Sequence, residues 1–415
     1  MPRVLLLLPT TTYRAADFLA AAGELRAEVV VATDARQTLA EVMGERALEV
    51  DFSDLEGACG AIVELAERLT LDAIVGVDDR GVMVAALAAG QLGLRHNPPE
   101  SVLATRDKAL LRRLLADGGV PQPAFALAGP DDDVGGVATE IGFPCVVKPT
   151  RLSGSRGVIR ADGPEEARAA GRRARSIAAD VLPDELRVDR ATPLDELLVE
   201  QYMPGAEVSL EGLLRSGELS VLAVFDKPDP LEGPYFEETI YVTPSRLPSA
   251  VLDRVAAVAA AAAAAIGLVE GPVHAEARVS GDQVTLLEVA ARSIGGLCSR
   301  ALRFRSGMSL EQVILRHALS LSLPPLAAQR RASGVMMLPI PRPGRLVEVR
   351  GRAEALAVEG VTGLELTIAP GRQVRPLPEG DRYLGFLFAQ GEEPAAVEAS
   401  LRRGHAHLEV VLDPL

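Results

Sequence analysis

The stretch GPVHAEARVSGDQVTLLEVAARSIGG, residues 271–296, predicts two antiparallel strands joined by a tight turn. Apolar and polar residues alternate over 273–279, and a second apolar run follows the turn-forming sequence Ser-Gly-Asp. Each strand carries one acid, Glu276 and Glu288. A two-residue turn would place the two acids on opposite faces of the hairpin. A three- or five-residue turn would place them side by side, with Cβ atoms roughly 5 Å apart.

Two carboxylates held side by side repel each other, so a cation is expected between them. Mg²⁺ is the economical choice for Glu276 and Glu288, because this ion takes one or two protein carboxylates and otherwise keeps water and substrate phosphates. Mn²⁺ would suit the same ligands. Four residues after Glu288, Arg292 offers a planar guanidinium that fits a phosphate or a carboxylate. The alternative is a surface hairpin whose two acids are solvated and bind no ligand.

Composition narrows the class of protein. The chain has 415 residues, enough for two to four domains, and 48% hydrophobic with 24% charged residues is typical of a soluble globular protein. A formal net charge of −14 argues against a nucleic-acid surface, which needs a basic face. Three cysteines, far apart in the chain, disfavour both disulfides and zinc and fit a cytoplasmic location. The opening residues 1–14 indicate a first strand, and neither a signal peptide nor a membrane span is expected.

Residues 1 to about 96 alternate between predicted strands and helices, which indicates a doubly wound parallel sheet covered on both faces. The turn after the first strand, at 9–12, lacks the G-x-G-x-x-G pattern, so a dinucleotide site of the Rossmann type is disfavoured. Asp78 and Asp79 directly follow the predicted strand 73–77, at the sheet edge where open α/β sheets bind ligands. A plain helix start explains the two aspartates equally well.

Two lysines lie in or next to segments that could bind phosphate. Residues 101–117 predict one helix that carries Lys108, although a lone helical lysine is usually solvated. Lys148 lies near the end of a short apolar strand, and small residues follow it over 153–157. Such a loop lets backbone amides wrap around phosphate oxygens, although its spacing is not that of a P-loop. A Gly/Ser turn alone is weak evidence, and the neighbouring lysine strengthens it.

Two further segments suggest where substrates would bind. The apolar strand LLVEQYMPG, residues 197–205, could hold an adenine whose amino group meets a backbone carbonyl or Glu200, and Glu207 could bond a ribose. Residues 226–239, DKPDPLEGPYFEET, contain three prolines and five acids between two strand-like runs. We expect a substrate-facing loop there whose acids could receive an ammonium group, and a solvated connection is an equally good explanation.

In this order, the segments resemble the ATP-grasp superfamily over about residues 1–320. The 226–239 segment, the R-x-x-G-G sequence that starts at Arg292 and the C-terminal module are similar to the L-amino acid ligase group. The resemblance implies an ATP-grasp fold of mixed α/β and α+β class. Its expected units are an N-terminal doubly wound pre-ATP-grasp domain (1–107), a linker helix with a mobile lid subdomain (108–198), a catalytic subdomain (199–324) and a small C-terminal α+β module (325–415).

The resemblance also implies a role for each matching residue, and these roles fall into four groups. Lys108 and Lys148 would contact the phosphates of ATP, under a mobile loop formed by Ser153, Gly154, Ser155, Arg156 and Gly157. Glu200, Gln201, Tyr202 and Met203 would line the adenine pocket, and Glu207 would hold the ribose. Glu276 and Glu288 would hold Mg²⁺, and Arg292 would bind the substrate carboxylate or its acyl phosphate. One departure is Ala290, because many members of the superfamily have an asparagine there as a metal ligand.

The activity implied is ATP-dependent ligation of a small-molecule carboxylate to an amine, through an acyl phosphate and with release of ADP and phosphate. Amino-acid-like substrates, a cytoplasmic location and a homodimer agree with the resemblance; nucleic acid and membranes are not expected as partners. The alternatives are a carboxylase-type enzyme such as biotin carboxylase or a purine-pathway ligase. Ala290 and the acidic composition also leave open an ATP-binding protein without catalysis.

Overall fold

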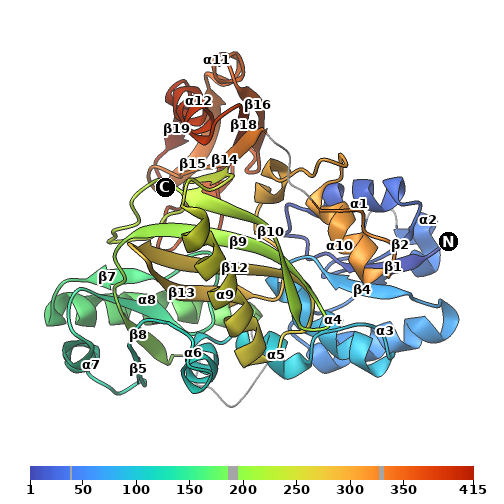
Figure 1. The fold of residues 1–415 in the computed structure, drawn as a ribbon, viewed down its shortest axis with the longest axis horizontal. Helices are drawn as coiled ribbons and strands as arrows, with labels where there is room; N and C mark the ends of the chain where they lie inside the picture. Colours follow the sequence, from blue (N-terminus) through green and yellow to red (C-terminus); the bar gives the residue numbers. More distant parts are fainter. Residues whose placement is uncertain (38–39, 186–194, 327–330) are drawn as a thin grey trace.

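A computed structural model describes residues 1–37, 40–185, 195–326 and 331–415 of the chain. Within that part the strands form four sheets (Figure 1). A parallel sheet at the N-terminus lies on one side of a long central sheet, and the sheet that contains residues 125–201 lies on the other. This arrangement agrees with the predicted mixed α/β and α+β class, whereas the exact domain boundaries stay predictions.

The N-terminal unit is a four-stranded parallel sheet in the order β3-β2-β1-β4. Alternate residues of its central strand enter two separate cores: Leu6 packs with Phe18 on one face, and Leu5 packs with Ile62 on the other. Both faces are therefore covered, as predicted. The elements are β1 (Arg3–Leu7), α1 (Ala15–Glu24), β2 (Glu28–Thr33), α2 (Ala40–Met43), η1 (Gly44–Arg46), β3 (Ala47–Glu49), α3 (Leu55–Arg68), β4 (Ala73–Gly76) and α4 (Asp79–Gln91).

The predicted single helix over 101–117 is wrong, because the chain forms two helices there, α5 (Pro99–Ala104) and α6 (Lys108–Asp117). Asp107 starts the second helix: its carboxylate accepts hydrogen bonds from the amides of Ala109 and Leu110. The break makes Lys108 the first residue of α6, with a side chain that is buried rather than solvated.

The second unit is an antiparallel sheet in the order β5-β8-β6-β7, packed against two helices. Val146 pairs with Glu200, so Lys148, two residues further along its strand, lies on the same face of the sheet as Glu200. The elements are β5 (Phe125–Ala128), α7 (Val134–Ile141), β6 (Cys145–Pro149), β7 (Ile159–Ala161), α8 (Pro164–Glu185) and β8 (Leu197–Gln201).

The central sheet has eight antiparallel strands in the order β13-β12-β9-β10-β11-β14-β18-β16. Three of its strands, β14, β18 and β16, come from the predicted C-terminal module, so that module continues the catalytic sheet instead of standing beside it (Figure 1). The elements are β9 (Ala206–Arg215), β10 (Glu218–Lys227), β11 (Ile240–Thr243), α9 (Ser249–Ile266), β12 (Glu270–Ser280), β13 (Gln283–Ala290), η2 (Cys298–Ala301), α10 (Leu310–Ala318), β14 (Ala332–Leu338), β16 (Val361–Leu366) and β18 (Gly385–Gly391).

The remaining C-terminal elements form a three-stranded sheet, β17-β15-β19, and two helices. Helix α12 packs against the central sheet through Val397 and Leu401, which share a core with Val242 and Leu387. The elements are β15 (Gly344–Arg350), α11 (Arg352–Leu356), β17 (Gln373–Val374), α12 (Pro394–Ala406) and β19 (Glu409–Asp413).

Among the described residues, only helix α9 is long and apolar enough to cross a membrane, by length and composition alone. Its packing explains that composition, because Val255, Ala259 and Ala262 lie in the core shared with β9, β12 and β13. Alanine both favours a helix and lets it approach the sheet closely. We therefore interpret α9 as a core helix.

We predict that Ala259→Asp lowers the free energy of unfolding by at least about 3 kcal/mol, because Ala259 is buried in this core and the new carboxylate would be desolvated without a partner. The matched control is Ala261→Asp on the exposed face of the same helix, which should cost under about 1 kcal/mol, the usual helix-propensity penalty. Urea unfolding measures both. Equal losses in the two variants would contradict the packing of α9 in the core.

Candidate active site

The two acids of the hairpin are direct partners in the register of β12 and β13, where Glu276 pairs with Glu288. The turn has two residues, since Ser280 pairs with Gln283, and by itself that turn would have put the acids on opposite faces. A β-bulge restores the register: Ala277 pairs with Leu286, and Leu287 is the extra residue. The acids therefore lie side by side for a reason that the turn length does not reveal.

Arg112, on α6, supports this bulge and joins it to the neighbouring sheet. Its Nη2 donates to the carbonyl oxygen of Leu287 at 2.6 Å, and its Nε donates to Glu200 Oε1 at 2.6 Å. Lys148 Nζ contacts the other oxygen of Glu200, also at 2.6 Å. Burial alone would raise the pKa of Glu200, but the charges of Arg112 and Lys148 hold this pKa at about 2.

Sequence reasoning assigned Glu200 to the adenine pocket and did not find Arg112. The structure shows that both oxygens of Glu200 are bound by cations of the chain itself, so its first task is to position Lys148 and Arg112. A signal was present in the sequence, because Arg112 follows Lys108 by four residues and thus shares its helix face.

We predict that Glu200→Gln lowers the free energy of unfolding by about 3–5 kcal/mol at pH 7, because it leaves buried Arg112 and Lys148 without a compensating charge. A carboxylate with a depressed pKa stabilises the fold above its unfolded pKa near 4.5, and this contribution is lost as the pH falls toward 2. The difference between wild type and variant in urea unfolding should therefore shrink below pH 4.5. A difference that is constant down to pH 3 would contradict the charge argument; Glu218→Gln, at an exposed site of the central sheet, is the control.

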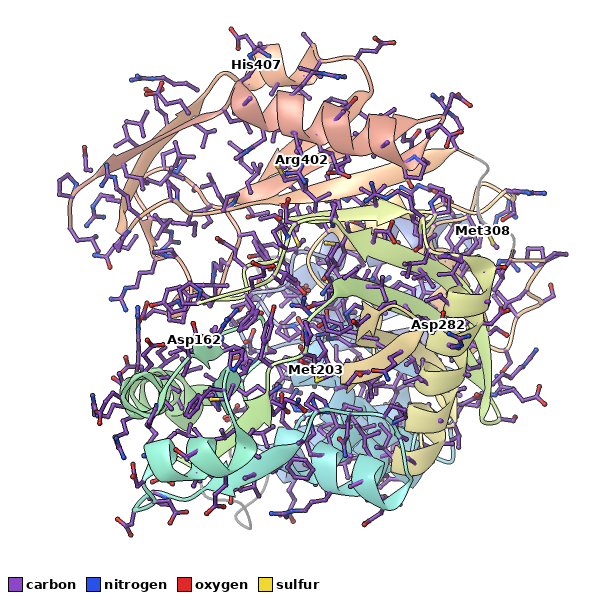
Figure 2. The ribbon with its side chains drawn as sticks, turned by 60° about the vertical axis from the view of Figure 1, so that its left-hand side comes forward. Asp162, Met203, Asp282, Met308, Arg402 and His407 are labelled. Atoms are coloured by element: carbon purple, nitrogen blue, oxygen red, sulfur yellow. The ribbon has the colours of Figure 1, made fainter. Side chains whose placement is uncertain are left out.

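A cavity of about 100 Å³ lies between the sheet of β5–β8 and the central sheet. Met203, labelled near the centre of Figure 2, lies where these two parts meet. This cavity collects most of the residues to which the sequence assigned nucleotide contacts: Lys108, Lys148, Ser153, Gly154, Ser155, Glu200, Gln201, Tyr202, Met203, Glu207, Glu276 and Glu288. We call it the nucleotide cavity.

Arg156, Gly157 and Arg292 do not line the nucleotide cavity. Arg156 and Arg292 line a second, adjoining cavity, and the amide of Gly157 donates instead to the carbonyl oxygen of Pro378 at 3.0 Å. The loop itself needs unusual backbone angles, with φ of +66° at Gly154 and +69° at Gly157, which glycine adopts without strain.

Glu207, Glu238 and Glu276 form a group in which each offers an oxygen within 4.8 Å of the others, close enough for a metal ion. The ammonium of Lys227 already contacts all three, at 2.7 Å from Glu207, at 2.9 Å from Glu276 and in a short contact with Glu238. Lys227 therefore does what a bound cation would do at this group. Sequence reasoning missed it, although a lysine two residues after buried Phe225 points to an inward-facing charge.

His274 is the second cation beside Glu276. Its Nε2 lies 3.1 Å from Glu276 Oε1, and its Nδ1 lies 2.5 Å from Glu211 Oε1. Burial would lower the pKa of His274, but Glu211 and then Glu276 raise this pKa to about 9. The burial that would raise the pKa of Glu276 is likewise outweighed by Lys227 and His274, which hold this pKa well below its usual range. His274 pairs across the hairpin with Ala290, the position where an additional metal ligand was considered.

We predict that Lys227→Met costs about 3–5 kcal/mol of unfolding free energy at pH 8, because buried Glu207 and half-buried Glu238 and Glu276 lose their shared cation. Without Lys227 the acids must have raised pKa values in the folded state, so the cost should fall as the pH is lowered to 5.5 and they are protonated. Lys227→Arg keeps the charge and should cost less at pH 8. Urea unfolding at both pH values is the measurement, and a cost that grows toward pH 5.5 would contradict the assignment.

The second cavity, of about 310 Å³, shares a common wall with the nucleotide cavity, formed by Ser153, Gly154, Ser155, Glu238, Glu276 and Glu288. We call it the substrate chamber. Arg292 lines it and is held by Asp79 through two parallel bonds, Nε to Oδ1 at 2.7 Å and Nη2 to Oδ2 at 2.9 Å. Burial would raise the pKa of Asp79, and Arg292 instead lowers it to about 2.

Asp78 and Asp79 both line the substrate chamber, and Asp78 also starts helix α4 by accepting from the amide of Arg80. Burial, together with the charge of Asp79, raises the pKa of Asp78 to about 6. Of the two alternatives left open by the sequence, the helix start is confirmed, and the role of the two aspartates in ligand binding stays a prediction. Glu238, from the 226–239 segment, lines both cavities, and the substrate-facing role of that segment stays a prediction.

Comparison with known families agrees with this geometry. An ATP-grasp domain profile matches residues 141–301, and the profile of L-amino acid ligase C-terminal domain 2 matches residues 336–413. The chain carries an ATP-grasp domain followed by an L-amino acid ligase C-terminal domain. The resemblance predicted from the order of the sequence segments is thereby confirmed, and the chain falls in the class of ATP-dependent ligases.

Individual relatives are distant in sequence. Alanine–anticapsin ligase of Bacillus amyloliquefaciens is 27% identical over 263 residues, and the match covers 61% of this chain and about half, 55%, of that protein. The crystal structure of L-amino acid ligase from Bacillus licheniformis is 21% identical, with a TM-score of 0.80 over 100% of this chain and 99% of that one. A biotin carboxylase domain from Hydrogenobacter thermophilus, solved with MgADP, has 16% identity and a TM-score of 0.69 over 99% and 90% of the chains. The structural likenesses show the shared fold.

Proposed function

We propose that this chain is an ATP-dependent carboxylate–amine ligase that forms an amide or peptide bond through an acyl phosphate and releases ADP and phosphate. The observation that supports it most is the common wall of the two cavities, where Glu276, Glu288 and the 153–155 loop face both. A nucleotide in one cavity would present its terminal phosphate at the wall, and an acid in the other would meet it there.

The chemistry explains why such a wall is useful. A carboxylate is a poor electrophile, because an amine would have to displace oxide. When a carboxylate oxygen attacks the γ-phosphorus, ADP leaves and an acyl phosphate forms; an amine then attacks the acyl carbon, phosphate leaves, and the amine gives up a proton. Phosphoryl transfer of this kind depends on positioning and charge neutralisation more than on covalent help from the protein.

We propose the following roles for the described side chains. Lys108 and Lys148 bind the phosphates, and the loop of Ser153, Gly154, Ser155, Arg156 and Gly157 closes over them. Glu200, Gln201, Tyr202 and Met203 line the adenine site, and Glu207 bonds the ribose. Arg292, held by Asp79, binds the substrate carboxylate or its acyl phosphate.

Glu276 and Glu288 fit a divalent cation, Mg²⁺ or Mn²⁺, because the bulge places them side by side at the wall where phosphate would lie. When bound, the ion would neutralise charge on the transferring phosphoryl group. Glu288 has room for this role, since its nearest cation, Lys108 Nζ, is 3.7 Å away. Glu276 would be a ligand of the ion while it remains in contact with Lys227 and His274.

Two alternatives have a specific basis. The fold is shared with a biotin carboxylase domain, so bicarbonate could be the acid that is activated. Ala290 offers no metal ligand, so an ATP-binding protein without turnover is the other. Small-molecule substrates and a cytoplasmic location belong to the proposal as well; the three cysteines are free and buried, which suits a reducing compartment.

We expect ADP release in the presence of Mg²⁺ and a suitable pair of amino acids, screened over all pairs with bicarbonate as a separate arm. Glu288→Gln should keep the fold and reduce ADP release at least a hundredfold, because the metal loses a charged ligand. Glu218→Gln, at an exposed site, should retain full activity. A Glu288→Gln variant with full turnover would remove the metal site from the argument, and ADP release with bicarbonate alone would favour the carboxylase alternative.

A further inference from the structure

Glu211, on β9, is buried outside both cavities, yet its carboxylate binds groups that belong to the candidate site. The residue is 1% exposed and lines neither the nucleotide cavity nor the substrate chamber. Its Oε1 lies 2.5 Å from His274 Nδ1, and its Oε2 accepts a hydrogen bond from the amide of Ile294 at 2.9 Å. The two oxygens of one buried carboxylate are therefore bound to two different parts of the site.

The first of these bonds leads to the proposed metal site. An ionised carboxylate can only accept a hydrogen bond, so the proton between Glu211 and His274 belongs to Nδ1. This bond fixes the orientation of the buried imidazole, whose Nε2 lies 3.1 Å from Glu276 Oε1. Groups that orient a metal ligand in this way change metal affinity by roughly 10- to 100-fold when they are replaced. Glu211 therefore reaches the proposed metal ligand through a single side chain.

The second bond leads to the loop that carries Arg292. Ile294 follows Arg292 by two residues and lines the substrate chamber. While Glu211 binds the amide of Ile294, the carbonyl oxygen of the same residue accepts from Arg14 at 3.3 Å. The backbone of the loop is thus held from the central sheet and from the N-terminal unit. Asp79 fixes the guanidinium of Arg292, and Glu211 holds the backbone from which that side chain extends.

We propose that Glu211 is a positioning residue that links the metal-binding acid Glu276 to the loop that binds the substrate carboxylate. This inference rests on the proposed ligase function and adds a residue that touches neither nucleotide, metal nor substrate. Its role follows from the reaction, because the metal-bound phosphate and the attacking carboxylate must meet in one geometry. A displacement of about 1 Å caused by a substitution far from the reacting atoms can lower the rate roughly a hundredfold.

The test uses Glu211→Gln, which keeps the shape of the side chain but has one acceptor oxygen instead of two, so it cannot accept from both His274 and Ile294. Mn²⁺ is titrated into the ADP-bound protein, and the unbound ion is measured by electron paramagnetic resonance. We expect the Kd of Mn²⁺ to rise at least about tenfold. The loss of a negative charge acts in the same direction. The Kd of ADP without metal should stay within threefold, because Glu211 does not line the nucleotide cavity.

The second readout is steady-state ADP release, measured at saturating ATP and Mn²⁺ with the amino-acid pair that gives the highest rate in the screen. We expect Glu211→Gln to raise the KM of one of the two amino acids at least about tenfold, because the loop that carries Arg292 loses a backbone contact. The matched control is Ser209→Ala. Ser209 lies two residues before Glu211 on the same face of β9, is equally buried, and its hydroxyl makes no hydrogen bond among the described residues. This variant should leave both readouts within twofold of wild type.

Unchanged Mn²⁺ affinity or unchanged KM values in a folded Glu211→Gln protein would overturn the link, as would equal losses in Ser209→Ala. Thermal unfolding shows whether each variant is folded. If Glu211→Gln is not, Glu211→Asp replaces it with the same expectations, because aspartate keeps the charge but is one methylene too short to reach both partners. Weaker Mn²⁺ binding together with no ADP release from any pair would contradict the ligase function and would still support the link from Glu211 to Glu276.

Discussion

The site depends on one extra residue in strand β13. Leu287 shifts the register so that Glu276 and Glu288 become partners, and its carbonyl oxygen is bound by Arg112. A bulge leaves a backbone group without its ladder partner, and a buried unpaired carbonyl would cost about 1–3 kcal/mol. Arg112 removes that cost and, through Glu200, also fixes Lys148. One guanidinium therefore aligns both the acids and a cation of the nucleotide cavity.

The acids on this frame are held by cations of the chain itself. Lys227 and His274 both contact Glu276, whereas the salt-bridge partner of Glu288 among the described residues is Lys108, at 3.7 Å. The two carboxylates therefore differ. Glu276 is bound by two cations, whereas Glu288, at the common wall of the two cavities, has one longer ion pair. A metal ion next to Glu276 would lie close to two positive charges, so in the proposed metal site Glu288 would attract the ion first. The pairing explains how like charges can lie together before any ligand arrives.

The fold and many residues of the candidate site could be predicted from the sequence, because the order of the strands, the hairpin and the 153–157 loop each follow from local sequence patterns. The bulge could not be predicted from the sequence, because residues 284–290 form one largely apolar run and nothing in it marks Leu287. The contact that binds the Leu287 carbonyl oxygen comes from Arg112, which is distant in sequence. The break in the helix over 101–117 was not predicted, because its one marker is Asp107. The side chain of Asp107 caps α6 by hydrogen bonds to amides only two and three residues further along, which leave no trace in the hydrophobic pattern. Lys227 and His274 were missed because their importance lies in which carboxylates fold against them. The side chains of Lys227 and His274 are both buried, and a pattern of apolar and polar residues does not distinguish a buried charge from a solvated one.

The C-terminal domain connects the 153–157 loop and helix α8 to the central sheet, which carries Glu276 and Glu288. The amide of Gly157 donates to Pro378, and Arg173 of helix α8 makes two bonds to Glu379, at 2.6 and 3.0 Å. The segment around Pro378 runs directly into β18 of the central sheet. Arg173 and Glu379 are both partly exposed, so their ion pair contributes at most about 1 kcal/mol. In the proposed mechanism, an ion pair of that strength would help to order the loop over bound phosphates and would still let it open for nucleotide exchange, whereas a buried pair would hold the loop more firmly.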